Sequence, residues 1–139
     1  MTDNLTPRQR RQAMRQVKSR NTTPEMKVRR LLHGLGFRYR LHVANLPGKP
    51  DLVFPKYKKV ILVNGCFWHG HEGCSASDRP SSNTPYWNAK LDRNKKRDRE
   101  NMALLREAGW DVFVIWECRT RNEDELRRIV AEIFPLGSE

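Results

Sequence analysis

Two cysteines and two histidines lie within nine residues, from Cys66 to Cys74, directly after the apolar run 60–63. The third cysteine, Cys118, follows a second apolar run, 112–116. Thiolates and imidazoles are the donors that bind Zn²⁺, and a closed set of four such donors forms a structural site. Because both apolar runs are typical of strands, the pattern predicts a small domain in which a metal site joins two strand ends.

Three cysteines and one histidine make the predicted zinc set: Cys66, His71, Cys74 and Cys118. Spacing alone leaves His69 open as the fourth ligand in place of His71. Without a metal, the cysteines would be small buried apolar residues and His71 a surface residue. An odd number of cysteines cannot pair fully within one chain, which favours a reducing compartment and metal ligation over disulfides.

The composition limits the partners. The 139 residues suit a single domain with one sheet covered by helices. There are 27 Lys and Arg residues against 16 acidic ones, giving a net charge of +11 and a pI near 10.1, which favours a polyanion such as DNA or RNA. Basic residues concentrate in 1–40 and 90–99. No apolar run is long enough to span a bilayer, and the N-terminus lacks the apolar segment of a secretory signal.

Residues 1–20 are predicted to be a basic DNA-binding arm, and residues 21–139 a single domain. The arm contains a candidate helix from Pro7 to Ser19, whose apolar strip includes Met14 and Val17. This strip is too narrow to stabilise a helix alone, so we expect the arm to order on its partner.

Periodicity and turn residues predict the elements of the domain. The expected order is a helix from Thr22 to Gly36, an edge strand over 37–43, strands over 51–54 and 60–63, a loop over 75–86, a helix over 87–109, a buried strand over 112–116, and a helix capped by Asn122. Trp110, Phe113 and Trp116 are expected in the core.

Asp51 is a candidate metal ligand, because a carboxylate at the start of a strand can hold Mg²⁺ beside a phosphate. The signal is weak alone, since the next strand has neither the second acid nor the lysine that usually accompanies it. His69 strengthens it: a neutral imidazole just beyond that strand could take a proton from water.

Taken together, these motifs resemble the very short patch repair (Vsr) DNA mismatch endonucleases, from about Arg8 to Arg119. The resemblance rests on Arg-Asn-Thr-Thr-Pro-Glu (20–25), Leu-Pro-Gly-Lys-Pro-Asp (46–51), Gly-Cys-Phe-Trp-His-Gly-His (65–71), the segment 87–98, and the Gly-Trp-Asp-Val and Trp-Glu-Cys segments within 109–118.

The resemblance implies a defined activity. Family members nick DNA beside a T·G mismatch, which arises when 5-methylcytosine deaminates, and they use Mg²⁺. It also implies a restriction-endonuclease-like core, in which helices flank a mixed central sheet, with a structural zinc site. The implied partner is double-stranded DNA with a T·G mismatch, bound by a monomer at the nucleoid of a bacterial cytoplasm. Mismatch-repair proteins are candidate further partners.

The matched motifs also imply roles for individual residues. Asp51 would bind Mg²⁺ through its carboxylate, Val63 would bind it through its backbone carbonyl, and His69 would be the general base. Glu25 and Asp98 match acidic positions that support the active site. The zinc ligands would be Cys66, His71, Cys74 and Cys118. The DNA contacts would be the wedging aromatics and the mismatch-reading residues, namely Phe67, Trp68, Trp87, Lys90 and Asn94.

Asn64 departs from the pattern, because some members have histidine there. An asparagine at the active site can orient water or phosphate but cannot titrate. This chain therefore lacks the second proton carrier that a histidine at this position would provide. Two alternatives stay open: a nuclease of the same fold with relaxed or different DNA specificity, and a zinc-stabilised DNA-binding module that does not cleave. The presence of both Asp51 and His69 favours cleavage.

Overall fold

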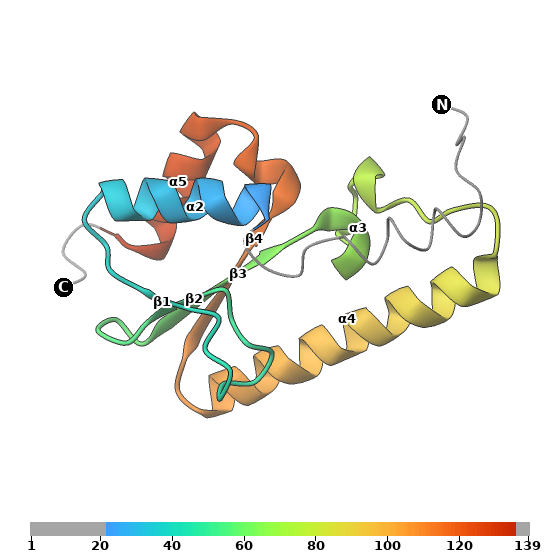
Figure 1. Ribbon diagram of the computed structural model, residues 1–139, viewed down its shortest axis with the longest axis horizontal. Helices are drawn as coiled ribbons and strands as arrows, with labels where there is room; N and C mark the ends of the chain where they lie inside the picture. The colour runs from blue at the N-terminus through green and yellow to red at the C-terminus, as the bar shows by residue number, and fades with distance from the viewer. Residues whose placement is uncertain (1–21, 136–139) are drawn as a thin grey trace.

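The computed structural model describes residues 22–135, and a four-stranded mixed sheet forms its centre (Figure 1). The strands lie in the order β1 (Arg40–Leu41), β2 (Leu52–Phe54), β3 (Lys59–Asn64) and β4 (Asp111–Trp116). β2 runs antiparallel to both β1 and β3, whereas β3 and β4 are parallel. Because β3 and β4 run in the same direction, their C-terminal ends lie at the same edge of the sheet, and a crossover connection joins them.

The long helices cover both faces of the sheet (Figure 1). α2 (Thr23–Gly34) and α5 (Glu123–Ile133) share one face, and α4 (Thr84–Glu107) lies along the other. Alternate strand residues point to opposite faces and so supply two cores. The larger core joins α2 and α5 to the sheet through Val28, Leu32, Leu52, Phe54, Ile61, Ile115, Leu126, Val130, Ile133 and Phe134. The smaller core joins Val53 and Val60 to Leu105 of α4.

Short turns follow the two parallel strands. The one-turn helix α3 (Cys66–His69) begins just after β3, and the 3-10 turn η2 (Glu117–Thr120) follows β4 directly. α3 ends at Gly70, whose φ of 64° is in the left-handed region that favours glycine. A second 3-10 turn, η1 (Ser75–Ser77), lies between α3 and α4. The parallel pairing therefore places α3 and η2 at one edge.

The mixed α/β class and the predicted order of the long elements are confirmed, although α3, η1 and η2 were not anticipated. The edge strand predicted over 37–43 is wrong in extent, because only Arg40–Leu41 pairs and His42 has a φ of 46°. The helix expected from Trp87 begins at Thr84, after Asn83 with a φ of 54°.

Two burial predictions also need correction. β4 was expected to be buried, but only Ile115 is, because β4 is the last strand of the sheet in the described chain. Trp116 packs against His71 and not in either core, whereas Phe113 and Trp110 pack against the larger and smaller cores.

The basic arm predicted over residues 1–20, including Met14 and Val17, lies outside the described residues. Within 22–135, no helix combines the length and apolar character needed to cross a membrane.

Candidate functional site

Asp51 is held between two strands. It immediately precedes β2, and its backbone carbonyl accepts a hydrogen bond from the His42 N–H at 3.2 Å. Its side chain turns toward β3, where Oδ2 accepts a hydrogen bond of 2.7 Å from the Val63 N–H. The carboxylate is therefore fixed at the sheet edge where β3 ends.

A second carboxylate and an imidazole lie beside Asp51. Glu25, in the first turn of α2, is only 1% exposed. The Nε2 atom of His42 lies 3.0 Å from Oε2 of Glu25, 3.1 Å from Oε1, and 3.8 Å from Oδ1 of Asp51. Donor atoms of the three residues all lie within 4.8 Å of one another, so they can hold a metal ion together. Arg29 also contacts Glu25, at 3.5 Å.

Burial raises the pKa of Asp51 from 3.8 to about 7. The hydrogen bond from Val63 opposes this rise, the negative charge of Glu25 adds to it, and His42 lowers it. Two carboxylates in a desolvated site resist simultaneous ionisation. A bound cation would relieve this repulsion, so the electrostatics suit a metal site.

The backbone carbonyl of Val63 lies on the same side of β3 as Asp51. In an extended strand the N–H and C=O of one residue face the same neighbour, and the N–H of Val63 donates to Asp51. The β2–β3 ladder ends at the Leu52–Ile61 pair, and Pro50 has no N–H to donate.

His69 and Asp98 form a short hydrogen-bonded pair across α3 and α4. Nδ1 of His69 lies 2.6 Å from Oδ2 of Asp98, and the side chains are 27% and 23% exposed. With the proton on Nδ1 donated to the carboxylate, Nε2 carries the free lone pair. Asn64 is the buried last residue of β3, one position beyond Val63.

The four predicted zinc ligands meet at the edge where β3 and β4 end. Donor atoms of Cys66, His71, Cys74 and Cys118 lie within 4.8 Å of one another. Nδ1 of His71 is 3.6 Å from Sγ of Cys66 and 3.5 Å from Sγ of Cys118. Tetrahedral Zn²⁺, with bonds of about 2.3 Å to sulfur and about 2.0–2.1 Å to nitrogen, requires a separation of about 3.6 Å. The structure places His71, not His69, in this cluster.

The surroundings of the cluster fit a metal. Cys66 is fully buried, and burial raises the pKa of its thiol to about 11, so the thiolate needs a cation to be stable there. The pKa of Cys74 is lowered, chiefly by a hydrogen bond from the Ala76 backbone. The His71 ring stacks on Trp116 with centroids 4.3 Å apart and planes 10° from parallel, which fixes its orientation.

Partly exposed aromatic rings gather between α3 and the start of α4. The ring centroid of Phe67 lies 5.0 Å from that of Trp68 and 5.5 Å from that of Trp87. Tyr86, which is 49% exposed, lies 5.2 Å from Trp87, and Nζ of Lys90 lies 5.7 Å from the centre of the Trp68 ring. Because α3 is helical, its two adjacent aromatics need not point to opposite sides.

Asn94 contacts the same turn from α4. Its Nδ2 donates a hydrogen bond of 3.2 Å to the Trp68 carbonyl, and its Oδ1 accepts one of 3.1 Å from Arg97. The Asn94 amide therefore links α4 to the backbone of α3 at Trp68.

Sequence reasoning missed two residues of these clusters. His42 was read as part of an alternating edge strand, and only its positive φ reveals that it leaves the strand. Tyr86 was assigned to the loop, although a proline one residue before it, after Asn83 and Thr84, is a helix-start signal that could have identified it.

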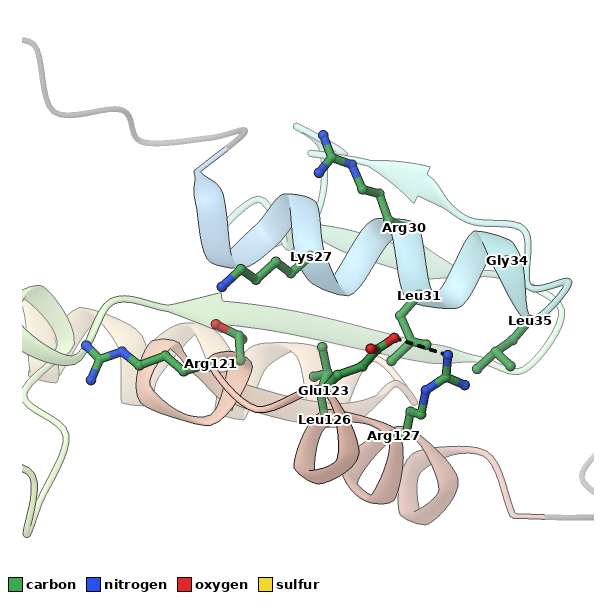
Figure 2. A pocket seen from close by; sticks show the side chains of 10 residues that line it. Lys27, Arg30, Leu31, Gly34, Leu35, Arg121, Glu123, Leu126 and Arg127 are labelled. Atoms are coloured by element: carbon green, nitrogen blue, oxygen red, sulfur yellow. Dashed lines mark hydrogen bonds and ion pairs between the residues drawn. The ribbon is translucent and has the colours of Figure 1, made fainter.

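A cavity of about 480 Å³ lies between α2 and α5, and its lining includes Thr120 and Arg121, which follow Cys118 (Figure 2). Cations line much of it, and Arg127 pairs with Glu123 at 3.2 Å. On α2, Lys27, Arg30 and Gly34 occupy the helix side opposite Glu25, as 100° per residue requires. This cavity therefore does not open onto the carboxylate site.

The sequence matches the family model described as DNA mismatch endonuclease Vsr over residues 2–75. It is 48% identical over 134 residues to the type II nicking enzyme V.XorIIP of Xanthomonas oryzae pv. oryzae. The aligned region covers 94% of this chain and 98% of that relative. Identity to the type II nicking enzyme V.NmeAIP of Neisseria meningitidis is 42%, covering 96% and 97% of the two chains. The DNA mismatch endonuclease Vsr of Escherichia coli is 40% identical, covering 81% and 72%.

Proposed function

The chain belongs to the DNA mismatch endonuclease Vsr family and is an endonuclease acting on DNA, and from this premise we propose that it nicks duplex DNA beside T·G mismatches with the help of Mg²⁺. One observation carries the proposal: the Asp51–Val63 contact and the His69–Asp98 pair flank the same short segment, 63–69. A candidate metal-binding oxygen and a candidate base thus lie near the same end of β3.

We also propose that the domain has a restriction-endonuclease-like core. The mixed sheet, with an acidic residue at the start of β2 and helices on both faces, supports this assignment. Asp51 and the Val63 carbonyl would hold the Mg²⁺, with Glu25 beside them. The chemistry that Mg²⁺ supplies when bound is neutralisation of negative charge developing at the scissile phosphate.

His69 would act as the general base. Asp98 keeps the proton on Nδ1, so that Nε2 can accept one from the attacking water. As the imidazole becomes charged, the 2.6 Å contact with the carboxylate stabilises it. Asn64, next to Val63, would orient the water or a phosphate oxygen through its amide.

The cluster of three cysteines and His71 would hold a structural Zn²⁺. Its donors come from α3, the loop after it, and η2, segments far apart in the sequence. Ligation at these points would fix α3, and with it the position of His69. The donor set and the separations near 3.6 Å support zinc over harder cations, which prefer oxygen.

Recognition would depend on the aromatic cluster. Phe67, Trp68 and Trp87 would enter the base stack at the mismatch, where a wobble pair is cheaper to separate from its neighbour. Lys90 and Asn94 lie beside these rings and would contact the mismatched bases. Met14 and Val17 of the basic arm would add contacts along the groove. We propose that the enzyme acts as a monomer on bacterial chromosomal DNA, with mismatch-repair proteins as further partners.

The test is a nicking assay on labelled duplexes that differ only in one pair, T·G or T·A, over varied flanking sequences. We expect Mg²⁺-dependent nicking of one strand of the T·G duplex and loss of it in Asp51→Ala, whose DNA affinity should be preserved. Equal nicking of both duplexes would support the nuclease of relaxed specificity. Binding without nicking in any flank would support the non-cleaving module and overturn the proposal.

A further inference from the structure

We propose that the imidazole of His42 is a direct ligand of the catalytic divalent cation, and that Glu25, His42 and Asp51 hold this ion before DNA binds. The inference rests on the proposed function, because it concerns the metal of that same site. It adds a nitrogen donor to a site otherwise built from oxygen.

The distances suit shared ligation. Two donors bound to one ion at about 2.1 Å lie about 3.0 Å apart at a right angle and farther apart at wider angles. Nε2 of His42 is 3.0 Å from a Glu25 oxygen and 3.8 Å from an Asp51 oxygen, so modest adjustments accommodate one ion. All three donors lie within 4.8 Å of one another.

Three separate segments bring these donors together. Glu25 comes from the first turn of α2, His42 directly follows β1, and Asp51 directly precedes β2. The backbone of His42 is hydrogen-bonded to Asp51, and its side chain is only 16% exposed. Since each donor is anchored by a different element, the site is formed without any contribution from DNA.

A structural ion pair between His42 and Glu25 is the competing explanation. Arg29 already contacts Glu25 on the same helix, so this carboxylate does not depend on His42 for a cationic partner. His42 also reaches toward Asp51, the residue most suited to bind the metal. The position of Nε2 between both carboxylates favours ligation.

A nitrogen ligand has a measurable consequence. Mg²⁺ prefers oxygen donors, whereas Mn²⁺ and later divalent ions accept imidazole more readily. Replacing His42 with glutamine should therefore weaken Mn²⁺ binding more than Mg²⁺ binding. We expect at least the tenfold loss that even an outer-shell partner can produce.

Mn²⁺ is the probe, added to the zinc-loaded full chain without DNA. Electron paramagnetic resonance measures the free ion, and its pulsed form detects hyperfine coupling to a directly bound nitrogen. The wild type should bind Mn²⁺ with a nitrogen coupling, and His42→Gln should lose the coupling and at least tenfold in affinity. His33→Gln, an exposed change on α2, is the matched control and should alter neither.

The outcomes separate this inference from the proposed function. Absence of nitrogen coupling in wild-type protein with bound Mn²⁺ would overturn the inference, whatever the variants do. Loss of the coupling in His69→Gln but not in His42→Gln would overturn it as well. If T·G duplex is nicked while His42→Gln binds Mn²⁺ like the wild type, only the inference fails. If the coupling is present but no duplex is nicked, only the proposed function fails.

Discussion

Asp51→Asn is expected to stabilise the metal-free protein at neutral pH while removing its nicking activity. Burial, reinforced by the Glu25 charge, raises the pKa of Asp51 from 3.8 to about 7. The folded state therefore retains a proton that the unfolded chain releases near pH 4. This contribution to stability is complete below the unfolded pKa and is lost as the pH rises through about 7. Asparagine has a similar shape and no charge to desolvate.

The pKa difference sets the size of the effect. A rise from 3.8 to about 7 corresponds to about 4 kcal/mol, because one pKa unit is about 1.4 kcal/mol. Roughly 1.7 kcal/mol of this is already lost at pH 5, where the unfolded carboxyl is mostly ionised. Between pH 5 and pH 8 the wild type should lose about 2–3 kcal/mol of unfolding free energy relative to the variant.

Urea denaturation of zinc-loaded protein, without Mg²⁺ and at steps from pH 5 to pH 8, measures this difference. Asp111→Asn, at an exposed position on β4, is the control and should track the wild type. Adding Mg²⁺ at pH 8 should stabilise the wild type and not Asp51→Asn. A gap between wild type and variant that stays constant with pH, or that narrows as the pH rises, would refute the reasoning.

Three further changes test the remaining clusters. Cys118→Ser should reduce bound zinc from one per chain and lower the free energy of unfolding, because the two strand ends lose their link; full zinc content by atomic absorption would contradict this. Asp98→Asn should slow single-turnover nicking by about 10²–10⁴-fold, the range that general base catalysis provides, at unchanged DNA affinity. An unchanged rate would show that Asp98 does not support His69 in the reaction. Trp68→Ala should reduce the ratio of T·G to T·A nicking, and an unchanged ratio would remove the wedge assignment.

The sequence was most informative where one local pattern decides the outcome. The helical spacing of apolar residues such as Val28 and Leu32 predicted α2. Asn122 predicted the start of α5, and in the structure its side chain accepts a hydrogen bond from the backbone N–H of Glu125. The residue types at 66–74 limited the candidate metal donors to a few. These features depend on neighbours within one or two turns, which a sequence displays directly.

The sequence was least informative where geometry depends on distant segments. The contact between His69 and Asp98 joins positions 29 residues apart on different helices. His42, whose side chain contacts Glu25, has a left-handed backbone conformation that non-glycine residues seldom take. The choice between His69 and His71 in the cysteine cluster likewise depended on how α3 turns, which spacing alone does not specify.

The compactness of α3 restricts how this enzyme can change over evolution. Within one helical turn and the residues that end it, Cys66 and His71 face the cysteine cluster, Trp68 joins the aromatic rings, and His69 meets Asp98. One residue inserted there would rotate everything beyond it by about 100°. Such an insertion would disturb three clusters of side chains at once. A substitution at Tyr86, which is 49% exposed at the start of α4, would change the aromatic surface without altering the length of α3.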